Sequence, residues 1–125
     1  MPENFSVKPT SQTAFTEVFS AYESAVSHQI GACQVIDDLL YISVGDAQRP
    51  ANSQLLDNLQ GKIIRMTLEG APVKDNPFYQ DDEVKNASNF IWAYGLRNPF
   101  GLHAVGNRLY AVDNGLKLDR FLEVT

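Results

Sequence analysis

Short apolar runs, each closed by turn residues, recur along the whole chain. Runs of about four to eight residues that are rich in Val, Ile, Tyr and Phe, and that end at Gly, Asp or Asn, are typical of β-strands. No segment carries a sustained apolar stripe of helical period, and one helical turn is predicted within residues 53–59. The strands are predicted at residues 15–19, 32–36, 39–44, 62–68, 90–94, 102–105, 109–112 and 121–125. This pattern predicts an all-β fold.

Two of the predicted hairpins resemble each other. Gly31, Val35, Leu40 and Tyr41 recur as Gly101, Val105, Leu109 and Tyr110, at an offset of 70 for the first two residues and 69 for the last two. The change of one residue is expected at the turns, where a change in length is tolerated best. Any two hairpins with Leu-Tyr in the second strand would match in this way, so a chance likeness stays open as the alternative.

A repeat unit of about 70 residues with four strands is typical of a propeller blade with long loops. The chain is then expected to have a polar lead-in at 1–13 and a partial propeller domain at 14–125, with blade units at about 14–70 and 71–125. A closed propeller typically needs 4–8 blades. Two blades are therefore expected to be a piece of a larger propeller, or to associate with other copies of the chain.

Composition excludes several classes of protein. The 125 residues include 10 Lys and Arg against 15 Asp and Glu, which gives a net charge of −5. This acidic balance argues against nucleic acid as the main partner. No apolar run approaches the roughly 18 residues of a membrane span. The single cysteine, Cys33, excludes an internal disulfide, and its place in a strand predicts a small buried apolar side chain.

Five strings in the sequence occur together in one known family. They are residues 40–47 (LYISVGDA), 59–66 (LQGKIIRM), 75–78 (DNPF), 91–102 (IWAYGLRNPFGL) and 108–115 (RLYAVDNG). In order and spacing they resemble the glucose/sorbosone dehydrogenase family, the soluble aldose sugar dehydrogenases that depend on pyrroloquinoline quinone (PQQ). The resemblance runs from about His28 to Gly115.

This resemblance implies a six-bladed β-propeller built from four-stranded antiparallel sheets, of which the chain matches about two blades. It also implies PQQ and calcium as cofactors, an aldose sugar as substrate, and oxidation of the anomeric carbon to a lactone. Members are typically periplasmic or secreted. The first six residues of this chain have neither the basic nor the apolar part of a signal peptide, so the location is left open.

The resemblance also assigns residues to the catalytic base. His28 matches the family histidine that takes the proton of the sugar hydroxyl, and imidazole suits this role because it titrates near neutral pH. Asp46 matches the carboxylate that orients this histidine. An ordinary loop histidine and an ordinary turn aspartate are the alternatives.

The cofactor residues follow from the same comparison. Arg97 and Asn98 match the pair that holds PQQ, since a planar cationic group suits a quinone that carries carboxylates. Asn114 matches a polar position facing the cofactor. The backbone carbonyls of Gly115 and Leu116 match the calcium ligands of the family.

The chain departs from the family pattern in places. The residues after His28 are Gln29-Ile30-Gly31-Ala32 and lack the basic residue of the family motif, and Leu116 replaces a common proline. Residues 117–120 (KLDR) follow the acidic Asp-Glu step of the family only loosely. A non-catalytic propeller module that binds a carbohydrate or a protein partner is therefore the alternative function.

Overall fold

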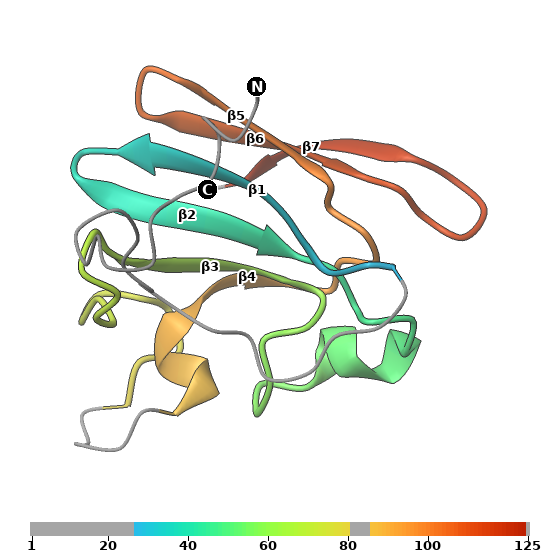
Figure 1. Ribbon diagram of the computed structural model, residues 1–125, viewed down its shortest axis with the longest axis horizontal. Helices are drawn as coiled ribbons and strands as arrows, with labels where there is room; N and C mark the ends of the chain where they lie inside the picture. Colours follow the sequence, from blue (N-terminus) through green and yellow to red (C-terminus); the bar gives the residue numbers. More distant parts are fainter. Residues whose placement is uncertain (1–26, 81–85, 125) are drawn as a thin grey trace, which may run out of the picture.

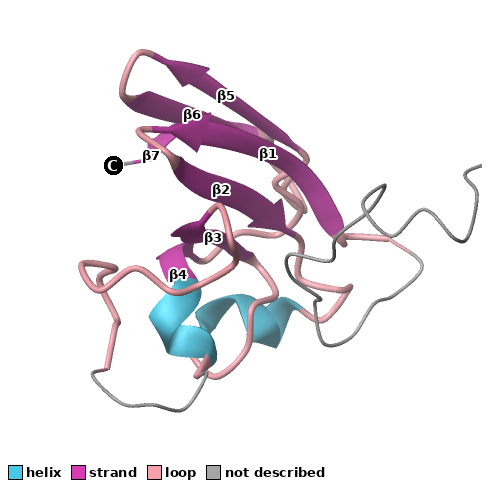
Figure 2. Ribbon diagram, turned by 60° about the vertical axis from the view of Figure 1, so that its left-hand side comes forward, coloured by secondary structure: helices cyan, strands magenta, loops and turns pink. Residues whose placement is uncertain are grey.

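A computed structural model of the chain describes residues 27–80 and 86–124. These residues form two antiparallel sheets that lie next to each other, and two short 3-10 helices lie on the side of the first sheet away from the second (Figures 1 and 2). The first sheet has the order β1 (Ile30–Ile36), β2 (Leu39–Val44), β3 (Lys62–Thr67) and β4 (Ile91–Tyr94). The second has the order β5 (Gly101–Val105), β6 (Arg108–Asp113) and β7 (Arg120–Val124). The 3-10 helices are η2 (Pro50–Gln54) and η3 (Ala87–Phe90).

The all-β, antiparallel prediction is confirmed. Each strand predicted between residues 32 and 125 has a counterpart in the structure, and the strand predicted at 15–19 lies outside the described residues. The second sheet has three strands within the described residues, where four were predicted for each blade. The sheet boundary lies between Tyr94 and Gly101, later than the division near residue 70 that the repeat suggests. The extent of the propeller domain at 14–125 stays a prediction.

The repeated hairpins differ in length within a strand and not at the turn. Both turns have two residues, since Ile36 pairs with Leu39 and Val105 pairs with Arg108. The extra residue of the first hairpin belongs to a β-bulge in β1, where the register with β2 shifts between Ile30 and Cys33. The prediction that placed the length change at the turn is therefore wrong.

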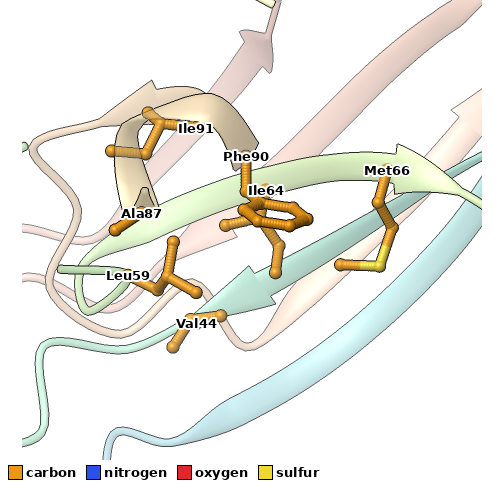
Figure 3. Close-up of a cluster of buried hydrophobic side chains, with 7 residues drawn as sticks. All are labelled: Val44, Leu59, Ile64, Met66, Ala87, Phe90 and Ile91. Atoms are coloured by element: carbon orange, nitrogen blue, oxygen red, sulfur yellow. The ribbon is translucent and has the colours of Figure 1, made fainter. Parts of the chain in front are cut away.

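Two apolar clusters cover the two faces of the first sheet. Adjacent residues of a strand point to opposite faces, so Ile64 packs in one cluster and Ile63 in the other. The first cluster joins β3 to η3 (Figure 3) and consists of Val44, Leu59, Ile64, Met66, Ala87, Phe90 and Ile91. The second cluster joins the two sheets and consists of Ile36, Tyr41, Ile63, Leu96, Leu109 and Ala111. Burial on both faces explains why β3 is buried almost along its whole length.

Strand β1 lies at the edge of the first sheet and exposes most of its residues. Cys33 is exposed there, so the prediction of a buried cysteine is wrong. Its position next to the bulge, in the edge strand, leaves it outside both apolar clusters.

No helix in the described part of the chain is long and apolar enough to span a membrane.

Candidate functional site

A pocket of about 520 Å³ lies where the ends of both sheets meet. His28 enters it from the segment before β1, Asp46 from the segment after β2, and Arg97 from the segment after β4. Gly115 and Arg120 line it from the connection between β6 and β7 and from the start of β7. The pocket therefore draws on four chain segments, and its volume is in the range of small-molecule sites.

His28 and Asp46 form a hydrogen-bonded pair in this pocket. The Nδ1 atom of His28 lies 2.8 Å from Oδ1 of Asp46, whose side chain is 2 % exposed. The backbone N–H of Gln48 donates to the same carboxylate oxygen over 2.9 Å. The predicted proximity of His28 and Asp46 is thus present in the structure.

The backbone around His28 is closely held. His28 has a φ of +61°, a left-handed conformation that is uncommon for residues other than glycine. The N–H of Ala47 donates to the His28 carbonyl oxygen over 3.0 Å. Gly45 packs so closely against His28 that a Cβ atom on it would overlap the His28 backbone. Glycine is therefore required at position 45 for this approach.

The pairing with Asp46 determines where the proton of the imidazole lies. An ionised carboxylate can only accept a hydrogen bond, so Nδ1 of His28 is the donor in this pair. In a neutral imidazole the other nitrogen, Nε2, is then an acceptor. This arrangement suits a general base.

Arg97 connects the histidine pair to the second sheet. Its carbonyl oxygen accepts from the Asp46 N–H over 2.8 Å. Its Nη1 atom donates to the backbone oxygen of Asn114 over 3.1 Å and to the Asn114 side-chain oxygen over 3.3 Å. Arg97 and His28 line the same pocket, as the sequence predicted.

Sequence reasoning did not identify Asp113, a fully buried carboxylate beside the pocket. Its Oδ1 accepts from the backbone N–H of Asn98 over 2.8 Å and from that of Arg97 over 3.1 Å. Its Oδ2 accepts from Nη2 of Arg120 over 2.5 Å. In the sequence, Asp113 precedes Asn-Gly and resembles an ordinary turn residue, so the pattern carried no signal of its burial.

The other predicted site residues fall into two groups. Gly115 and Leu116 line the pocket, whereas the described lining includes neither Asn98 nor Asn114. The Asn98 carbonyl oxygen accepts from the N–H groups of Phe100 and Asn114, which closes the turn behind Arg97.

Among residues 27–80 and 86–124, no cluster of three or more His, Cys, Asp or Glu side chains could hold a metal ion.

The comparisons with known proteins agree with this architecture. Residues 4–119 match the glucose/sorbosone dehydrogenase family. The chain is 41% identical over 63 residues to the aldose sugar dehydrogenase YliI of Escherichia coli (strain K12), an alignment that covers 50% of this chain and 16% of that protein.

Two solved structures are similar over most of the described fold. The soluble aldose sugar dehydrogenase from Escherichia coli in the apo-form has a TM-score of 0.75 and 30% identity, over 87% of this chain and 32% of that one. The PQQ-bound aldose sugar dehydrogenase from Streptomyces coelicolor has a TM-score of 0.73 and 31% identity, over 86% of this chain and 31% of that one. The chain spans about a third of the length of these β-propeller enzymes. It belongs to the glucose/sorbosone dehydrogenase family.

Proposed function

We propose that the pocket is part of a PQQ site and that the chain supplies the catalytic base for oxidation of an aldose at its anomeric carbon. The observation that carries this proposal is the His28–Asp46 pair, because it leaves an acceptor nitrogen on an imidazole that lines the pocket. The PQQ-bound relative from Streptomyces coelicolor supports the choice of cofactor.

The residues around the pocket fit the group. PQQ carries carboxylates, and the guanidinium of Arg97 is a planar cation that matches them. Gly115 and Leu116 would offer backbone carbonyl oxygens to calcium, which prefers oxygen ligands. Bound there, the quinone would supply the two-electron acceptor for the sugar.

The contribution of the protein is then to move one proton and to stabilise one charge. His28 accepts, at Nε2, the proton that the anomeric hydroxyl loses as the carbonyl of the lactone forms. The imidazolium that results faces the buried carboxylate of Asp46, which stabilises its positive charge. Asp46 also fixes the ring orientation, because its Oδ1 is held by the Gln48 N–H.

Two measurements on the full chain test the proposal. PQQ is titrated with and without calcium and followed by quinone absorbance, and dye reduction by glucose is then assayed with PQQ and calcium present. We expect saturable PQQ binding, and sugar-dependent dye reduction where the chain is assembled with the other blades of a propeller. The His28→Ala variant should keep its PQQ affinity and lose at least about 100-fold in rate.

His103→Ala is the matched control, because this exposed histidine lies on β5 and does not line the pocket. An equal loss in both variants would remove His28 from the mechanism. Binding of PQQ or sugar without any turnover would favour the non-catalytic module. Failure of the chain to bind PQQ would refute the proposed cofactor site.

A further inference from the structure

A second guanidinium lines the pocket on the side of the second sheet. Arg120, the first residue of β7, is a lining residue together with Arg97 and Lys117.

Asp113 fixes the position of Arg120. The Nη2 atom of Arg120 donates to Oδ2 of Asp113 over 2.5 Å and to the carbonyl oxygen of Gly95 over 3.3 Å. Within the described residues, both hydrogen bonds of this guanidinium use Nη2, so the Nε and Nη1 donors remain available. The side chain of Arg120 is 43 % exposed and can reach a ligand without being uncovered first.

The Asp113 carboxylate accepts hydrogen bonds from both Arg120 and Arg97. Its other oxygen, Oδ1, accepts from the backbone N–H of Arg97, so Asp113 holds the backbone of one arginine and the head group of the other. The Asp113 carboxylate is fully buried, whereas the Arg120 side chain that it binds is 43 % exposed. Asp113 thereby links the backbone of Arg97 to the guanidinium of Arg120, and both arginines line the pocket.

The charges of the pocket favour an anion. Arg97, Lys117 and Arg120 line it, and the one carboxylate in the described lining, Asp46, is already engaged by His28 and Gln48. Asp113, beside the pocket, is paired with Arg120, so three cations face two engaged carboxylates, and the remaining excess of positive charge attracts anionic ligands. A ligand with two separated carboxylates would match the two guanidinium groups.

We propose that Arg120 is a second carboxylate-binding residue of this pocket, oriented by Asp113, and that the pocket takes a planar polycarboxylate held between Arg97 and Arg120. The proposal rests on the proposed function in one respect, since it identifies the polycarboxylate as PQQ. The alternative source of the carboxylate is an acidic sugar substrate, and the experiment distinguishes the two.

The test compares PQQ affinity among variants of the full chain. Arg120→Met should weaken PQQ binding about 10- to 100-fold, because a hydrogen bond to a charged group is lost. Arg120→Lys should give an intermediate loss, since it keeps the charge without the planar fork. Arg108→Met is the control, because Arg108 is an exposed arginine on β6 that does not line this pocket.

The dependence of binding on salt separates a charge contact from a structural effect. The affinity of the unsubstituted chain should fall more steeply with added NaCl than that of Arg120→Met, whereas a variant that is merely less stable would keep the slope. Urea unfolding of each variant shows which part of a loss comes from unfolded protein. Equal PQQ affinity in Arg120→Met and in the unsubstituted chain would overturn the proposal.

Two further probes keep the proposal testable apart from the proposed function. Citrate binding that is weakened by Arg120→Met would support the carboxylate site even if PQQ did not bind, and absence of binding of both PQQ and citrate would overturn it. An effect of Arg120→Met confined to glucuronate, with PQQ affinity unchanged, would assign Arg120 to the substrate and overturn its assignment to the cofactor.

Discussion

The ammonium nitrogen of Lys62 lies 2.8 Å from the carbonyl oxygen of Asn52, although Lys62 is completely buried at the start of β3. It also donates to the carbonyl oxygen of Gln60 over 2.6 Å. The side chain thus holds the segment between β2 and β3, which contributes Pro50 and Ser53 to the pocket. Burial lowers the pKa of Lys62 from 10.5 to about 8, and nearby Asp57 partly opposes this shift.

The lowered pKa of Lys62 predicts a pH dependence of stability. Between about pH 8 and 10.5, the unfolded chain binds a proton at this lysine that the folded chain does not. The free energy of unfolding should therefore rise with pH across this window, and the contribution of Lys62 to the slope should vanish below it. Urea unfolding of the unsubstituted chain and of Lys62→Met, compared at each pH, measures this contribution. Parallel pH profiles of the two proteins would contradict the prediction.

The pairing of His28 with Asp46 predicts the tautomer of the imidazole. Asp46→Ala removes the oxygen that accepts from Nδ1, so the ring proton is no longer held there and should move to Nε2. The 15N chemical shifts of the two His28 nitrogens should then exchange character, while those of His103 stay unchanged. If His28 is the base, the same variant should lose at least about 100-fold in dye reduction. Unaltered 15N shifts would show that Asp46 does not set the tautomer.

A methyl group at Gly45 is predicted to disturb the backbone of His28. Gly45→Ala would place a methyl group against the backbone of His28, at an expected cost of about 1–3 kcal/mol in the free energy of unfolding. Gly101→Ala is the control, because the nearest atom to its new Cβ is the Cβ of Val112 at 3.6 Å. Chemical denaturation of both variants checks the difference, and equal stabilities would refute the close approach of His28 to Gly45.

Asn76 and Asp75 both bind Arg65, but they are predicted to differ strongly in their effect on stability. The buried Asn76 accepts from Nε of Arg65 and donates to the carbonyl oxygens of Arg65 and Asn89. Asn76→Ala removes these three buried hydrogen bonds and should cost about 2–4 kcal/mol. The carboxylate of Asp75 is 82 % exposed, so Asp75→Ala should cost less than about 1 kcal/mol. Urea midpoints rank the two variants, and the reverse order would contradict this account.

The strands could be predicted from the sequence because their signal is local. Alternating apolar residues and turn residues indicate where a strand begins and ends, and the observed β2 has the predicted limits. Pairing is not local, which is why the sequence did not show that β4 completes the first sheet or that β1 carries a bulge. The exposure of Cys33 follows from the edge position of β1, and this position depends on the same pairing.

The residues of the candidate site also divide into those that could be predicted from the sequence and those that could not. His28, Asp46 and Arg97 were identified by resemblance to a family, and the structure brings them to one pocket. Asp113 and Lys62 were not identified, because a charged residue at a strand end or strand start is usually solvated. Their importance comes from burial by distant segments, and no sequence pattern records it.

The pocket is walled by both sheets, since His28 and Asp46 come from the first and Gly115 and Arg120 from the connection and edge strand of the second. A ligand bound there contacts both sheets and stabilises their contact with each other. When the pocket is saturated with such a ligand, the two sheets should unfold as one cooperative unit at a higher temperature. Conversely, any substitution that weakens the contact between the sheets, even far from the pocket, should lower the affinity of the pocket for its ligand.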